Sequence, residues 1–169
     1  KFQLGERVVF LEKIKKLKQA YLLKINGYGV VEKLDKGNAI VRIEKAFDSI
    51  GTGLYVMKKD YEDELALPVN FKEITTKRSG KIVYLSNNAV TSGNGYRAVI
   101  DLGIEDGIKV GDIVEILRTT TEHGIKRDVR LGEAQIIYVS KNYATVKILS
   151  SILEIENGDF AKLAKVGIY

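Results

Sequence analysis

The chain has 169 residues, of which 45% are hydrophobic and 29% are charged, a balance typical of a globular protein that buries a core and not of a disordered chain. It contains no Cys and a single His, which excludes disulfides and thiolate metal sites and leaves any histidine chemistry to His123 alone. The net charge of +5 arises in residues 1–60, which hold 13 Lys and Arg against 7 Asp and Glu, whereas residues 61–169 are nearly balanced.

The sequence carries no apolar run of the roughly 18 residues needed to cross a membrane as a helix. It opens on KFQLGERVVF, which lacks the charged, apolar and small-residue regions of a signal peptide. Because the first residue is Lys1, we expect the chain to be a piece of a longer protein.

The basic excess is densest in EKIKKLKQ, Glu12–Gln19. A helix over Lys13–Leu23 is one interpretation, since apolar residues there are three and four positions apart. We favour a β-hairpin, because the corresponding TTTEHGIKRDV of the second half is rich in β-branched and turn residues. A solvated hairpin tip is the simpler role for the segment, and contact with an anionic partner is the alternative. The candidate contacts for such a partner are Lys13, Lys15, Lys16 and Lys18.

The chain contains an internal duplication. Gly27–Met57 aligns without gaps onto Gly132–Lys162, and one residue of gap then places Phe2–Leu11 over Ile108–Leu117. The second copy has a front part, Ser79–Gly107, that has no counterpart before Lys1. Identical pairs include Gly5/Gly111, Gly27/Gly132, Ala39/Ala144, Val41/Val146, Ile43/Ile148 and Gly53/Gly158.

The local patterns are those of short strands separated by turn residues, and they predict an all-β fold of tandem small antiparallel β-barrels, SH3-like or related. The first copy, residues 1–60, is expected to lack its opening strands: either these strands lie upstream in the full-length protein, or the first copy is a shorter version of the barrel. Residues 61–79 are expected to form a packed linker, and residues 80–169 the second barrel. The linker is expected to give the two barrels a shared apolar seam through Leu65, Leu67, Val69, Phe71 and Ile74. The expected strands of the second copy are Lys81–Leu85, Tyr96–Leu102, Asp112–Arg118, Glu133–Val139 and Tyr143–Leu149.

The glycine-rich stretch GIEDGIKVGDIVEI, Gly103–Ile116, raises the question of a ligand loop. It lacks the Lys-Ser/Thr ending and the helix of a phosphate loop, and its acids and glycines do not fit the spacing of a calcium loop. We interpret it as a strand–turn–strand segment, with Ile108 and Val110 facing the core. Asp106-Gly107 would form one turn and Gly111-Asp112 the next.

No catalytic set is evident, so we expect no enzyme activity, no cofactor and no metal. The carboxylate pairs Glu62/Glu64 and Glu154/Glu156 are more typical of solvated strand edges than of a glycosidase site. SGNGY, at Ser92–Tyr96, is interpreted as a loop tip.

The stretches VIDLGIEDGIKVGDIVEILR and LGEAQIIYVSKNYATVKILSSILEIENGDFAKL resemble the tandem β-barrel region downstream of LysM in bacterial LysM-containing envelope proteins. GYGVVEKLDKGNAIVRIEKAFDSIGTGLYVM is similar to the preceding repeat of those proteins. The D-G-hydrophobic-x-hydrophobic-G-D turn also resembles the C-terminal domain of flagellar assembly protein T and, more distantly, the barrels of the rod-shape-determining protein MreC.

This resemblance implies an exported protein of the cell envelope or periplasm, anchored to peptidoglycan by a LysM module that this chain lacks. The chain itself would be a non-catalytic interaction or spacer module that binds envelope proteins. A pair of SH3-like barrels that binds nucleic acid through the basic hairpin is the alternative. The balanced charge of the second copy and the scarcity of aromatic residues argue against that alternative.

Overall fold

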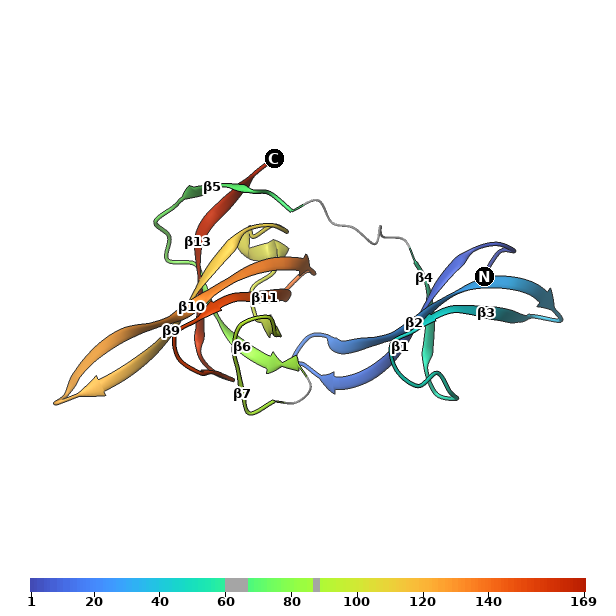
Figure 1. The fold of residues 1–169 in the computed structure, drawn as a ribbon, viewed down its shortest axis with the longest axis horizontal. Coiled ribbons are helices and arrows are strands. Elements are labelled where there is room, and N and C mark those ends of the chain that lie inside the picture. Colours follow the sequence, from blue (N-terminus) through green and yellow to red (C-terminus); the bar gives the residue numbers. More distant parts are fainter. Residues whose placement is uncertain (60–66, 87–88) are drawn as a thin grey trace. The chain divides into compact units, whose positions relative to one another are not determined.

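The computed structural model describes residues 1–59, 67–86 and 89–169 (Figure 1). The chain divides into two compact units, Lys1–Asp63 and Glu64–Tyr169. Regular structure is almost entirely β in both, which confirms the predicted all-β class. Within the described ranges, no helix is long and apolar enough to span a membrane.

The second unit contains a closed antiparallel β-barrel of six strands (Figure 1). Its strands follow the order β13-β6-β8-β11-β10-β9, and a further pairing of β13 with β9 closes the ring. Strand β5 adds to the outside of β13, and β7 pairs with β12 in a separate two-stranded sheet. The elements are β5 (Asn70–Glu73), β6 (Ser79–Leu85), β7 (Thr91–Ser92), β8 (Arg97–Ile100), the 3-10 turn η2 (Ile104–Asp106), β9 (Ile113–Glu122), β10 (Ile125–Val139), β11 (Ala144–Ser151), β12 (Ile155–Glu156) and β13 (Phe160–Ile168).

Closure of this barrel creates a full hydrophobic core. Strand residues alternate between the barrel interior and the outside, so β-branched residues at every second position of β11 and β9 meet inside. Seventeen buried residues form one cluster that draws on every strand of the ring, and Ile82, Ile136 and Ile148 are among the largest of them.

The first unit is an open sheet of four antiparallel strands in the order β3-β2-β1-β4. The predicted hairpin over Glu12–Gln19 is confirmed and the helix alternative is wrong: the amide of Leu17 donates to the carbonyl of Ala20 at the hairpin tip, 2.9 Å away. The strands are β1 (Arg7–Lys16), β2 (Tyr21–Asp35), β3 (Asn38–Ala46) and β4 (Tyr55–Lys58).

The duplication holds at the level of strand register. In the first unit Phe10 pairs with Gly27 on one side and Val56 on the other, and their counterparts Ile116, Gly132 and Ala161 pair in the same way. A bulge follows each time, and its extra residue is buried, Asn26 in β2 and Leu131 in β10. A Cβ at either glycine would collide with a carbonyl of the neighbouring strand, that of Lys45 or of Ser150.

A turn before the first repeated strand is also shared. Gly5 and Gly111 both have positive φ, 78° and 89°, where a side chain is strained. The Gly5 amide donates to the carbonyl of Val31, and the Gly111 amide donates to that of Ile136. In each copy a backbone hydrogen bond thereby joins the bulged strand, β2 or β10, to the turn that precedes β1 or β9.

The two copies differ in what completes the sheet. No described strand of the first unit corresponds to β6 or β8, so β3 and β4 are the outer strands of its sheet. Its buried cluster has only three members, Val8, Phe10 and Val31. Within the described residues, the first copy is therefore an open sheet without counterparts of β6 and β8.

The turns between the second and third repeated strands also differ. Lys36 and Gly37 have positive φ, 45° and 89°, as a two-residue hairpin turn requires. Lys141 and Asn142 do not, and a longer loop joins Val139 to Ala144. The two-residue turn with positive φ is thus present in the first copy and absent at the equivalent position of the second.

The predicted linker over residues 61–79 packs onto the second unit from Pro68 onward. Pro68 lies against Gly111 and Gly167, β5 pairs with β13, and Ile74 packs against the barrel core, whereas Val69 is exposed. Leu65 and the Glu62/Glu64 pair lie outside the described residues.

We expect Gly111→Ala to destabilise the second unit more than Gly158→Ala. Both glycines have positive φ, which costs a side chain about 1–2 kcal/mol, but a Cβ at Gly111 would also displace Pro68, whereas nothing lies within 4 Å of a Cβ at Gly158. Urea unfolding of the two variants checks this. Equal losses would show that Pro68 is not held against the turn.

Candidate functional site

The four predicted lysines lie on the hairpin between β1 and β2, and all are exposed. Lys13, Lys15 and Lys16 belong to β1, and Lys18 lies in the tip. The ammonium of Lys13 is 3.5 Å from the ring centroid of Tyr21, a cation–π contact within the hairpin. The structure therefore places the four charges together on one element, while one of them already has an aromatic partner.

In the glycine-rich segment Gly103–Ile116 the predicted turn at Asp106-Gly107 is confirmed, since the 3-10 turn η2 leads into Gly107, whose φ is 72°. The predicted strand between the two turns is wrong, because Ile108–Val110 is not in a strand and β9 begins only at Ile113. The Asp106 carboxylate accepts the Gly103 amide at 2.8 Å. One carboxylate oxygen of Asp112 accepts a hydrogen bond from the Lys109 amide at 2.9 Å. The other oxygen accepts one from the Gly167 amide of β13 at 3.1 Å. Both carboxylates thus bind the backbone of their own unit. Ile108 and Val110 were predicted to face the core; Ile108 is buried and Val110 is half-buried.

A second clamp joins η2 to the turn between β10 and β11. Glu105 accepts a hydrogen bond from the Asn142 amide group at 2.7 Å and forms an ion pair with Lys141 at 3.2 Å. Hydrogen bonding from Lys141, reinforced by Asn142, lowers the pKa of the Glu105 carboxyl.

A partly buried charge pair of the second unit joins Arg118 on β9 to Asp159, which directly precedes β13. The guanidinium donates two hydrogen bonds to the carboxylate, at 2.7 and 2.8 Å, and Asp159 is buried. The Asp159 carboxylate raises the pKa of Arg118, against the effect of burial. Arg118 also holds the carboxylate of Glu156 at 3.3 Å and the carbonyl of Glu154 at 3.0 Å. The Glu154/Glu156 pair is therefore part of a structural network.

In the first unit a different residue donates the hydrogen bond that corresponds to the one from Arg118 to the Glu154 carbonyl. Its counterpart of Arg118 is Glu12, and the carbonyl equivalent to that of Glu154 belongs to Ser49. Asn26, the buried bulge residue, donates its side-chain amide to this carbonyl at 3.0 Å. Both copies thus fasten the loop that leads into the last repeated strand.

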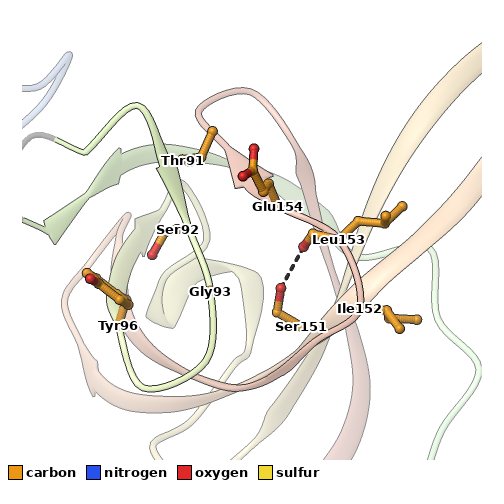
Figure 2. Close-up of a pocket in the computed structure, with 8 residues that line it drawn as sticks. All are labelled: Thr91, Ser92, Gly93, Tyr96, Ser151, Ile152, Leu153 and Glu154. Atoms are coloured by element: carbon orange, nitrogen blue, oxygen red, sulfur yellow. Dashed lines mark hydrogen bonds between the residues drawn. The ribbon is translucent and has the colours of Figure 1, made fainter.

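The predicted loop tip SGNGY borders an open recess of about 480 Å³ (Figure 2). Thr91, Ser92 and Gly93 form one wall, and Ser151–Glu154 forms the other; the pairing of β7 with β12 holds the walls together. The Ser151 hydroxyl donates to the Leu153 carbonyl, and the buried Ser92 hydroxyl has no partner. Among the eight residues that line the recess, Glu154 is the only acid, so the lining provides no acid–base pair.

The single histidine has a plain structural placement. His123 is exposed at the tip of the β9–β10 hairpin, with a φ of 50°, and forms a two-residue turn with Gly124. Among the residues with described positions, no group of three or more His, Asp or Glu is placed to hold a metal ion.

The most unusual surface of the molecule is the side of the first unit that corresponds to β6 and β8 of the second. Ile43 is 50% exposed, but its counterpart Ile148 is fully buried. Val56 is 37% exposed, but its counterpart Ala161 is fully buried. We call this surface the open side: the outer edges of β3 and β4 together with Ile43 and Val56.

Tyr55 and Met57 on β4 and Ile40 on β3 are also exposed, but successive strand residues point to opposite faces, so these three side chains lie on the other face of the sheet from Val56 and Ile43. The open side itself combines the unpaired backbone edges of β3 and β4 with the apolar side chains of Ile43 and Val56.

Comparison of the chain with protein-family profiles, curated proteins and solved structures found no match.

Sequence reasoning overlooked the open side, although a signal for it was present. Ile43 aligns with Ile148 as an identical residue, while the second copy has a front part that the first lacks. Together these facts place an apolar, inward-facing residue opposite a missing strand.

We expect Arg118→Met to lower the free energy of unfolding of the second unit by about 3 kcal/mol, because it leaves Asp159 buried without its charged partner. Chemical denaturation measures the change. The double variant Arg118→Met/Asp159→Leu, which installs the leucine present as Leu54 in the first copy, should recover part of the loss. A single variant as stable as the parent would contradict the assignment.

Acidification should remove the stability that the contacts of Glu105 with Lys141 and Asn142 contribute. Because the pKa of Glu105 is lowered in the folded state, its contribution is present above the unfolded value of about 4.3 and is lost as pH falls through the folded value. Glu105→Gln should therefore lose less stability than the parent between pH 7 and pH 3, measured by urea unfolding at each pH. Glu122→Gln at the hairpin tip serves as the control, and identical pH profiles for the parent and Glu105→Gln would refute the clamp.

Proposed function

We propose that this chain is a non-catalytic module that binds a protein partner through the open side of its first unit. The observation that carries the proposal is the exposure of Ile43 and Val56 beside two outer strands, at positions whose counterparts are buried in the second unit. Association with a partner removes this apolar surface from water, which is the main favourable term in most protein–protein binding.

The second unit fits the role of a rigid support. Its ring is closed, its core is large, and several of its charged residues bind their own backbone or one another, as Arg118 binds Asp159. Its carboxylates hold turns and strand ends in place, which supports a structural and not a chemical role for them.

We also propose that the module belongs to the cell envelope. The support is the resemblance of both repeats to the region downstream of LysM in envelope proteins. A LysM module elsewhere in the parent protein would bind peptidoglycan, and the present chain would hold or space envelope proteins near the wall.

Nucleic-acid binding is the second candidate. The observation that favours it is the placement of Lys13, Lys15, Lys16 and Lys18, all exposed, on one hairpin. Such binding is driven by displaced counterions and weakens steeply with salt.

The test is affinity capture with the immobilised chain and with the variant Ile43→Glu/Val56→Glu. We expect the parent chain to retain a specific envelope protein from an envelope extract, and the variant to lose it. Both substituted side chains are exposed, so the variant should fold as the parent does, which circular dichroism verifies.

Two controls address the competing functions. Purified peptidoglycan sacculi are incubated with the chain, and release of soluble fragments would overturn the non-catalytic assignment. A labelled oligonucleotide is titrated with salt against the parent chain and against a variant with all four hairpin lysines changed to Ala. Salt-sensitive binding lost in that variant, without retention of an envelope protein, would favour the nucleic-acid function.

A further inference from the structure

We propose that the first unit binds the surface of an anionic lipid membrane through the outer face of its sheet. This face lies opposite the one that carries the buried residues Val8 and Phe10, so it is distinct from the open side, and the inference does not rest on the proposed function. The outer face is defined by six side chains that alternate onto it from β2 and β4: Tyr21, Leu23, Ile25, Tyr28, Tyr55 and Met57.

The duplication shows that the outer face is unusual. Four positions in the same strand register are apolar in the first unit and charged in the second: Val9/Glu115, Ile25/Arg130, Tyr28/Glu133 and Met57/Lys162. The charged set forms ion pairs, since the guanidinium of Arg130 lies 2.9 Å from the carboxylate of Glu115 and 2.7 Å from that of Glu133. The second unit thus carries on this face what a solvated sheet needs, whereas the first unit carries a patch of the kind that marks a binding surface.

The apolar side chains of the outer face are accessible. Tyr55 and Met57 are each 52% exposed, and Tyr21 is 49% exposed. Val9 and Leu11, which belong to the same face of β1, are buried. The first sheet therefore has apolar residues on both faces, whereas a sheet with one solvated face alternates apolar and polar residues.

The charges that lie on the outer face are lysines. The ammonium of Lys13 is 3.5 Å from the ring centroid of Tyr21 and 5.6 Å from that of Tyr55. The ammonium of Lys59 is 4.1 Å from the ring centroid of Tyr28. The positions that alternate onto this face in β1 and β4, and in β2 from Tyr21 to Tyr28, include no acid. The outer face is therefore complementary to an occupant that is both anionic and apolar.

An anionic lipid bilayer combines these two properties at one surface. Its phosphates attract ammonium groups, while tyrosine rings and aliphatic side chains enter the boundary between headgroups and acyl chains. A protein interface fits less well, because lysine is depleted from such interfaces. A single-stranded nucleic acid stacks its bases on aromatic rings, but Leu23, Ile25 and Met57 offer it no ring. Ammonium groups also lie over the rings of Tyr21 and Tyr28, where bases would stack.

The test is binding to lipid vesicles of defined composition. We expect the chain to sediment with vesicles of equal parts phosphatidylglycerol and phosphatidylcholine, about tenfold or more tightly than with phosphatidylcholine alone. The chain contains no Trp, so Met57→Trp provides a single reporter whose fluorescence should shift to the blue when the outer face enters the bilayer. Leu153→Trp is the matched control at an exposed position of the second unit, and it should show no shift.

The second unit supplies the variant that removes the apolar surface. The triple variant Ile25→Arg/Tyr28→Glu/Met57→Lys installs the charged counterparts that the same framework carries, and it adds two positive charges and one negative. We expect its affinity for the anionic vesicles to fall by about tenfold or more in spite of the added charge, because the apolar contact is lost. Lys13→Gln/Lys59→Gln, which keeps the apolar side chains, should also weaken binding to the anionic vesicles. Circular dichroism verifies that both variants fold.

The outcomes separate this inference from the proposed function. A chain that does not bind the anionic vesicles would overturn the inference, and so would a triple variant that binds them as the parent does. Ile43→Ser/Val56→Ser removes the apolar side chains of the open side without a change of charge. We expect this variant to bind vesicles as the parent does and to lose the captured envelope protein. Loss of vesicle binding in it would move the lipid site to the open side and overturn the inference.

Two further measurements test the other occupants. A single-stranded oligonucleotide that quenches Met57→Trp, in a chain that does not bind vesicles, would overturn the lipid assignment in favour of nucleic acid on the same face. We expect the parent chain to sediment as a monomer without vesicles. A dimer that the triple variant dissociates would overturn the assignment in favour of a second copy.

Discussion

Backbone hydrogen bonding along the β6–β8 pair is the constraint on which the difference between the two units depends. Where the pair is present, the sheet closes on itself, both edges disappear and seventeen residues are buried together. Where no described strands take that place, the same four-stranded framework keeps two outer strands and a cluster of three buried residues. The same repeat thus occurs once in a closed barrel and once in an open sheet.

The features that the copies share are those that a strand framework needs before it can close. A glycine turn of positive φ, at Gly5 or Gly111, ties the first strand to the bulge of the second. The bulge residue, Asn26 or Leu131, is buried in both copies. The loop into the last repeated strand is fastened in each, by Asn26 in one and by Arg118 in the other. The divergence of side chains around a fixed backbone argues that the backbone geometry is the inherited element.

The strand content and the duplication could be predicted because both are local in the sequence. Alternating apolar residues and Gly-containing turns define strands wherever they occur, and the constant spacing of the repeat aligned Ile43 with Ile148 correctly. The segment Ile108–Val110 was wrongly predicted as a strand because its apolar residues alternate, whereas Asp106 and Asp112 hold the chain in turns on either side of it by accepting nearby amides. Whether Ile43 is covered depends on strands distant in the chain, so the alignment places Ile43 opposite absent strands but only the structure gives its exposure.

The long β9–β10 hairpin has a consequence for how the barrel moves. Strand β13 pairs with β9 only as far as Leu117, whereas β10 follows β9 to Glu122, and the hairpin projects past the ring (Figure 1). A two-stranded ribbon is marginally stable in water by itself. The inner half of β9 can open only when the barrel unfolds, but the outer half can fray on its own. A single strand therefore spans nearly the whole range of local stability in this unit, from the global unfolding free energy to almost none.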